Sequence, residues 1–202
     1  MSRHGKKRIS LSGGFLLLLA WFWLCNGLDT LIFVLAAAAL HECGHLWMLY
    51  RVGGHLHSLR INALGAVMET DSHRLGYWQE LLVLLAGPGM NLLTALLVAF
   101  FGGNRGAAFV GVNFVLCAFN LLPIVPLDGG QSLYLAVSWA AGPMVGEWAV
   151  RCIGTACALS VISLILWLMY CSGGSLWFVP VVGGLLTAIM HLWSKKLSYY
   201  LK

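Results

Sequence analysis

The chain alternates between long apolar runs and short polar interruptions. An apolar run of about 20 residues is long enough to cross the hydrocarbon core of a bilayer as one helix. Turn residues separate most neighbouring runs, as at Asn26-Gly27 and Gly102-Gly103. The pattern therefore predicts about six transmembrane helices, at 11–27, 28–50, 77–101, 106–122, 147–170 and 176–194.

Two stretches between these runs break the helical pattern. The interval 51–76 is the longest polar one, and its segments 55–62 and 66–70 predict two short strands that form a small hairpin. After the fourth run, two prolines and two glycines between Asn120 and Gly130 forbid a regular helix. We therefore expect an all-α polytopic membrane protein with a small β-hairpin or sheet after helix 2 and an irregular loop after helix 4.

Composition agrees with this fold class. The chain is 60% hydrophobic and 9% charged, with a mean hydropathy of +0.85, whereas a soluble domain carries about 25% charged residues. The net charge of +5 is small and dispersed, so nucleic acid is not an expected partner. We expect a single integral-membrane domain over 1–202, with a core at 28–133 and flanking helices at 11–27, 147–170 and 176–194. The six cysteines are expected to be small apolar fillers, with a disulfide between Cys25 and Cys171 as the alternative, because both fall near the outer face.

The distribution of basic residues predicts the orientation. With the N-terminus inside, all of the 12 Lys and Arg residues except Arg105 fall on the cytoplasmic side. Both termini are then cytoplasmic, in the cell membrane. The second helix runs from outside to inside, which places His41 about 14 Å from its inner end near Tyr50.

The second run carries the chemistry, in the sequence His41-Glu42-Cys43-Gly44-His45. Positions i and i+4 of a helix lie on one face, so both imidazoles can bind one Zn²⁺, and Glu42 can act as general base. Ionisable groups inside a membrane are costly and therefore usually functional. The simpler alternative is a buried polar cluster that bonds neighbouring helices.

A catalytic zinc ion takes three protein ligands, so one is still missing. Asp29 lies roughly 18 Å away along the same helix, which excludes it. Asp128 lies in irregular backbone that follows an apolar run ending on the same side of the membrane as the histidines. Within a membrane, irregular backbone is tolerated only where it contacts protein or water. The alternative role of Asp128 is to cap the helix that starts near Gln131. The remaining candidates suit surface or helix-end positions better: Glu69, Asp71, Glu80, Glu147 and His191.

Three motifs in this order resemble the site-2 protease (M50) family of intramembrane zinc metalloproteases. They are the H-E-x-x-H pentapeptide, Ala86-Gly-Pro-x-x-Asn91, and Asn120-x-x-Pro-x-x-Pro-Leu-Asp128-Gly. The likeness covers about 41–133 and is strongest to the bacterial stage IV sporulation protein FB-like subgroup. It implies one Zn²⁺ per chain on His41, His45 and Asp128, with Glu42 as the catalytic base. It also implies that Asn120 and Pro126 hold the substrate or the oxyanion.

The resemblance also implies partners. The substrate would be a membrane-tethered pro-sigma or anti-sigma factor, and membrane inhibitory or regulatory proteins would gate its access. That subgroup usually carries a CBS domain, and other members a PDZ domain. The 202 residues contain neither, so we do not expect nucleotide regulation through this chain.

Several alternatives stay open at this stage. Asn120 could be a helix-end cap, and the Gly87-Pro88 and Asn91 positions favour helix packing over chemistry. His55 and His57 are typical of exposed strand residues. For the whole chain, a metal transporter or a catalytically inactive membrane adaptor would also place histidines and an aspartate in a membrane.

Overall fold

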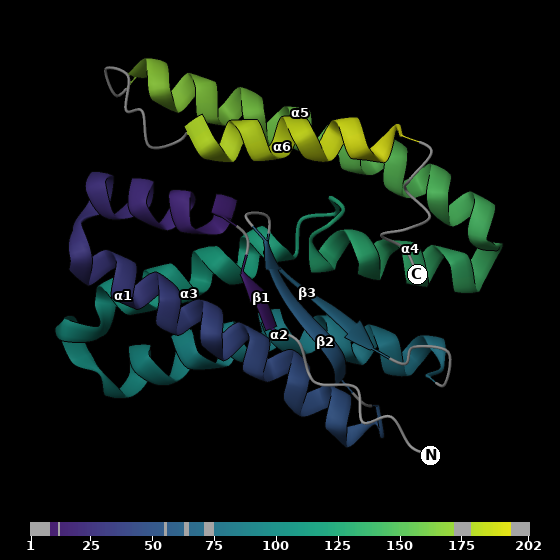
Figure 1. Cartoon of the computed structure of the whole chain (residues 1–202), viewed down its shortest axis with the longest axis horizontal. Coiled ribbons are helices and arrows are strands. Elements are labelled where there is room, and N and C mark those ends of the chain that lie inside the picture. The colour runs from purple at the N-terminus through teal and green to yellow at the C-terminus, as the bar shows by residue number, and fades with distance from the viewer. Residues whose placement is uncertain are drawn as a thin grey trace.

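In the computed structural model, the chain is described at residues 9–11, 13–54, 56–62, 65–70, 75–171 and 179–194. Its elements follow one another in the order shown by Figure 1. The polar tails at 1–8 and 195–202, and His55, lie outside the described residues. The elements are β1 (Ile9–Leu11), α1 (Gly13–Arg51), β2 (Leu56–Asn62), β3 (Gly65–Thr70), α2 (Tyr77–Phe101), η2 (Gly103–Gly106), α3 (Ala107–Asn120), α4 (Asp128–Ala141), α5 (Pro143–Cys171) and α6 (Val179–Leu192).

Helix α1 consists of two arms that meet at Gly27. Gly27 has φ 81° and ψ 171°, which is not a helical conformation and is one that glycine adopts without the steric cost of a side chain. The side-chain amide of Asn26 donates to the Phe22 carbonyl at 3.2 Å, which holds the end of the first arm. The turn predicted at Asn26-Gly27 is therefore present, and the second arm runs away from it beside α2 and α3 (Figure 1).

The expected fold class is wrong in its number of membrane-crossing helices. Among the described residues, three helices are long and apolar enough to cross a membrane: Leu19–Arg51, Tyr77–Phe101 and Pro143–Cys171. Helices α3 and α6 are apolar but have 14 residues each. At 1.5 Å per residue such a helix reaches roughly 21 Å, short of the ~30 Å hydrocarbon core. For α3, hydropathy alone joined the helix to its apolar flanks and overstated its length, whereas residues 176–178 before α6 lie outside the described residues.

The fold is also not all-α. A three-stranded sheet has the order β1-β2-β3. Strands β2 and β3 pair antiparallel within the polar interval after α1, and β1 pairs parallel to β2, with Ser10 opposite Arg60. Strand β1 lies before α1, in a segment for which the sequence predicted no strand. A strand of three residues is too short to show the alternation of polar and apolar positions that marks a strand. The sheet therefore has one more strand than the predicted hairpin.

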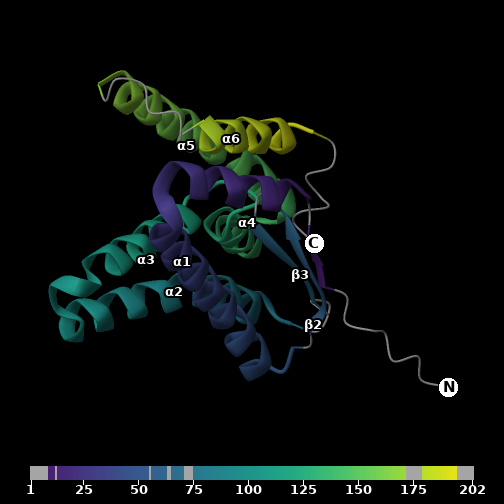
Figure 2. The same ribbon diagram turned by 60° about the vertical axis from the view of Figure 1, so that its left-hand side comes forward.

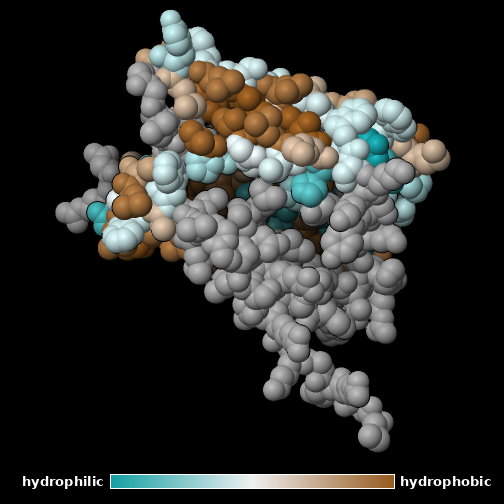
Figure 3. All heavy atoms as spheres, turned by 45° about the horizontal axis from the view of Figure 1, so that its top comes forward, coloured by the Kyte–Doolittle hydropathy of each residue, from teal (hydrophilic) through white to brown (hydrophobic). Residues whose placement is uncertain are grey.

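Helices α5 and α6 form a separate pair on one side of the molecule, while the second arm of α1 lies with α2 and α3 on the other (Figures 1 and 2). The face of the α5–α6 pair is largely hydrophobic (Figure 3), as expected for a surface in contact with lipid. Cys25 and Cys171 are free thiols, so the structure does not pair them.

The pair α5–α6 also forms the core that supports the loop at 121–127. Ile124 of the loop is fully buried against Ala158 of α5 and Leu185 of α6. Val125 is buried in a second cluster with Val150 and Leu192. The loop leads directly into α4, so this packing fixes where α4 begins.

Candidate active site

The second arm of α1 presents His41 and His45 on its buried face. The two side chains are one helical turn apart, and both residues are less than 8% exposed. Their Nε2 atoms lie 3.0 Å apart, and the rings meet edge to face with centroids 4.6 Å apart. The pentapeptide therefore directs both imidazoles to one point inside the protein, as the spacing predicted.

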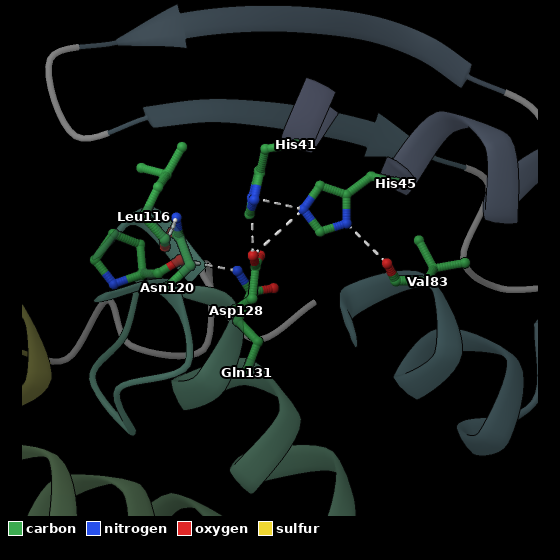
Figure 4. Close-up of polar contacts among 8 residues, drawn as sticks. His41, His45, Val83, Leu116, Asn120, Asp128 and Gln131 are labelled. Atoms are coloured by element: carbon green, nitrogen blue, oxygen red, sulfur yellow. Dashed lines mark hydrogen bonds and ion pairs between the residues drawn. The ribbon is translucent and has the colours of Figure 1, made fainter. Parts of the chain in front are cut away.

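Asp128 meets the histidines from a different part of the chain. Its Oδ2 atom lies 3.1 Å from His41 Nε2 and 3.3 Å from His45 Nε2. Figure 4 shows the carboxylate at the start of α4 pointing at the two rings. Asp128 is the first residue of α4, and Leu127 is the N-cap residue without a side-chain capping bond. The alternative that Asp128 caps a helix near Gln131 is therefore wrong.

Close packing of α1 against α2 holds His45 in place. The Nδ1 atom of His45 lies 2.7 Å from the carbonyl oxygen of Val83 on α2. A carbonyl can only accept, so Nδ1 carries the proton and Nε2 presents its lone pair to the cluster. Glycines permit the approach, because a Cβ atom at Gly44 would lie 2.5 Å from the Ala86 carbonyl oxygen and one at Gly87 would overlap the His45 ring.

Close packing also fixes the loop before Asp128. Cβ atoms at Gly129 and Gly130 would overlap the backbone of residues 121–125, so the turn requires glycine at these positions. The side-chain amide of Gln131 donates to the Pro126 carbonyl at 3.0 Å. Gln131 was expected only to mark a helix start, and its bond to the loop could not be read from the sequence.

Three buried donor atoms thus converge, and their chemistry fits a metal ion. The candidate ligand atoms of His41, His45 and Asp128 all lie within 4.8 Å of one another. Asp128 Oδ2 is buried and accepts no well-aligned hydrogen bond from the residues that the structure describes, although both Nε2 atoms are near it. Two neutral imidazoles and one carboxylate are a donor set that catalytic zinc sites use.

Electrostatics favours the ionised form of the third ligand. Burial raises the pKa of the Asp128 carboxyl, but hydrogen bonds and positive charge from His41 and His45, when these rings are protonated in the metal-free protein, outweigh this effect and hold that pKa below its usual value. A carboxylate binds a cation only in its ionised form. Asp128 is therefore prepared to act as a ligand near neutral pH.

The remaining predicted residues lie around this cluster. Glu42 is half-buried on α1 and lies near His41, His45 and Asp128. Asn120 ends α3, and its side-chain nitrogen donates to the Leu116 carbonyl at 3.0 Å. Pro126 follows a cis peptide bond in the loop before Asp128.

The fold and the site define a membrane-embedded protein with a buried His-His-Asp centre and a glutamate beside it. Residues 29–106 match the model of Peptidase family M50. The site-2 protease from Methanocaldococcus jannaschii has the same fold, with a TM-score of 0.66 at 20% identity, over 100% of this chain and 94% of that one.

Two curated relatives carry zinc metalloprotease names. The chain is 30% identical to sll0528 of Synechocystis sp. over 116 residues, covering 53% of this chain and 31% of that protein. It is 27% identical to zinc metalloprotease MJ0392 of Methanocaldococcus jannaschii over 137 residues, covering 63% of this chain and 40% of that protein. The chain thus spans less than half the length of either relative.

Residues 29–106 are thus similar to peptidase family M50, and both relatives carry the name of a zinc metalloprotease. The family is one of zinc metalloproteases, so Zn²⁺ is the metal that His41, His45 and Asp128 would hold.

Proposed function

We propose that the chain is an intramembrane zinc metalloprotease that hydrolyses a peptide bond in or near the membrane segment of a membrane-associated protein. The observation that carries this proposal is the convergence of His41, His45 and Asp128 at one buried point with Glu42 beside it. Three ligands leave one position for water or substrate, which distinguishes catalytic zinc sites from structural ones. The catalytic core is residues 28–133.

The roles of the residues follow from their chemistry. Zinc, when bound, supplies a Lewis acid that makes water nucleophilic near neutral pH. Glu42 takes the proton from the attacking water and later delivers it to the leaving amine. Asn120 can turn its amide from the Leu116 carbonyl toward the oxyanion. Pro126 helps to hold the substrate backbone beside Asp128.

A transmembrane substrate must unwind before it can react, because its helical carbonyls are already hydrogen-bonded. The sheet offers a surface for the unwound segment. Within the described strands, β2 is central, and β1 and β3 form the outer edges. In Figure 4 strands of the sheet lie on the histidine side of the cluster. An extended substrate segment can add to one of these edges by main-chain hydrogen bonds.

The orientation of the chain and its substrates are part of the same proposal. The basic residues favour cytoplasmic termini and a site nearer the cytoplasm. A cut at that depth releases a cytoplasmic product, which suits a pro-sigma or anti-sigma factor as substrate. Membrane proteins that block access to the site would then regulate the cut.

Among other functions, a metal transporter would need ligands along a path to both membrane faces. Within the described residues, His41, His45 and Asp128 are the only group of three or more His, Cys, Asp or Glu side chains that could hold a metal ion. This favours a single fixed site over a path.

The proposal is tested by co-expressing the chain with single-pass membrane proteins and comparing wild type with Glu42→Gln. We expect Glu42-dependent cleavage within or near the transmembrane segment of a substrate. Substrates that carry Gly or Asn in that segment should be cut faster than versions with a rigid helix. Zinc binding without any Glu42-dependent cleavage across the membrane proteome would instead support the transporter or the adaptor.

A further inference from the structure

The two zinc-site histidines differ in how their outer nitrogens are held. His45 Nδ1 has the Val83 carbonyl at 2.7 Å, whereas His41 Nδ1 is buried and has no hydrogen-bond partner in the part of the chain that the structure describes. A metal-binding histidine almost always donates its second ring N–H to an oxygen, which fixes its tautomer and orientation. His41 therefore needs an acceptor.

Asn91 on α2 is a second buried side chain that lacks hydrogen-bond partners among the described residues. It is 0% exposed, and among the described residues neither its Oδ1 nor its Nδ2 atom has a partner. An amide buried without hydrogen bonds is costly, above all in a membrane protein. Helix packing does not explain an amide at this position, because an apolar residue of the same size would pack without that cost.

The register between the two helices places these two positions opposite each other. Gly44 of α1 faces Ala86 and Met90 of α2, and His45 contacts Gly87. The helices are antiparallel, so one turn back along α1 from His45 corresponds to one turn forward along α2 from Gly87. That step leads to His41 on one helix and Asn91 on the other.

We infer that Asn91 is a positioning residue for the zinc site. With zinc bound, its Oδ1 atom accepts the N–H of His41 Nδ1, a bond that the described residues do not make without the ion, and so holds the imidazole with its Nε2 lone pair toward the metal. The two histidines are then held alike, His45 by a main-chain oxygen of α2 and His41 by a side-chain oxygen one turn further along the same helix. This inference rests on the metal site of the proposed function and not on proteolysis.

The test measures zinc affinity of the purified chain by competition with a chromophoric chelator, together with thermal unfolding of the metal-free protein. Asn91→Leu removes the acceptor at similar volume and should lower zinc affinity by about 10–100-fold, while the unfolding temperature of the metal-free protein stays the same or rises. Asn91→Asp keeps an acceptor oxygen and should bind zinc at least as well as wild type. A packing role predicts the reverse order for these two variants.

Asn113 on α3 supplies the matched control. It is also 0% exposed and has an unpartnered Oδ1 atom, but its Nδ2 donates to Phe109 of its own helix. Asn113→Leu should leave zinc affinity unchanged. The inference is overturned if Asn91→Leu binds zinc like wild type, or if Asn113→Leu loses as much affinity. If Asn91→Leu does not fold, Asn91→Ala adds no volume and is compared with Asn113→Leu in its place. A wild type that binds zinc but cleaves nothing would defeat the proposed function and leave this inference standing.

Discussion

Gly87 of α2 lies directly against the imidazole of His45 of α1, and a Cβ atom at position 87 would overlap that ring. The ring cannot simply move away, because its Nδ1 atom is bonded to the Val83 carbonyl and its other side faces His41 and Asp128. The glycine is therefore part of the geometry of the metal site.

Gly87→Ala should displace His45 and weaken zinc binding by at least about tenfold, the lower end of what the loss of an outer-shell partner costs. Gly89→Ala is the matched control on the same helix, because a Cβ atom there would have nothing within 4 Å. It should bind zinc normally and stabilise the helix by up to about 1 kcal/mol. Chelator competition and thermal unfolding measure both. Normal zinc binding by Gly87→Ala would contradict the role assigned to this contact.

Asp128→Asn should lose zinc, because the amide keeps the shape of the side chain but removes the charge that binds the cation. The loss should exceed the roughly 10–100-fold effect of an outer-shell change. Asp29→Asn provides the control, since Asp29 is exposed and lies on the same helix as the histidines but far from them. Zinc content by elemental analysis of the purified variants distinguishes them. Equal zinc content in both variants would exclude Asp128 as a ligand.

Ile124→Ala should destabilise the fold by about 2–5 kcal/mol, because it leaves a cavity between the loop and the α5–α6 pair. Ile124 is 0% exposed, whereas Leu121, three residues earlier, is 44% exposed, so Leu121→Ala should cost less than about 1 kcal/mol. Thermal unfolding checks the energies. Zinc affinity should fall only in Ile124→Ala, since that packing positions Asp128. If both variants retain normal zinc affinity, the α5–α6 pair does not hold the ligand loop.

The sequence predicted the parts of the site that depend on local spacing. The i, i+4 histidines had to share a helix face, and the prolines and glycines before Asp128 had to form an irregular loop. Asp128 could be selected because the other acidic groups suited different positions. The turn at Gly27 also followed from its residue types.

Other features could not be predicted because they depend on tertiary contacts. The Val83 oxygen that holds His45 is a main-chain atom, so no residue type marks it. Strand β1 depends on parallel pairing with β2, about 50 residues away in the chain. The number of membrane-crossing helices was overstated because hydropathy does not show where a helix ends.

The central claim is that zinc bound by His41, His45 and Asp128 serves hydrolysis with Glu42 as the base. The most direct measurement is made on purified wild type and Glu42→Gln, with the zinc-to-protein ratio and the cleavage rate of a membrane substrate determined on the same samples. Glu42→Gln should hold as much zinc as wild type and cleave at least about 100-fold more slowly, the usual effect of losing a general base. Cleavage at the wild-type rate by the zinc-loaded Glu42→Gln variant would contradict the account.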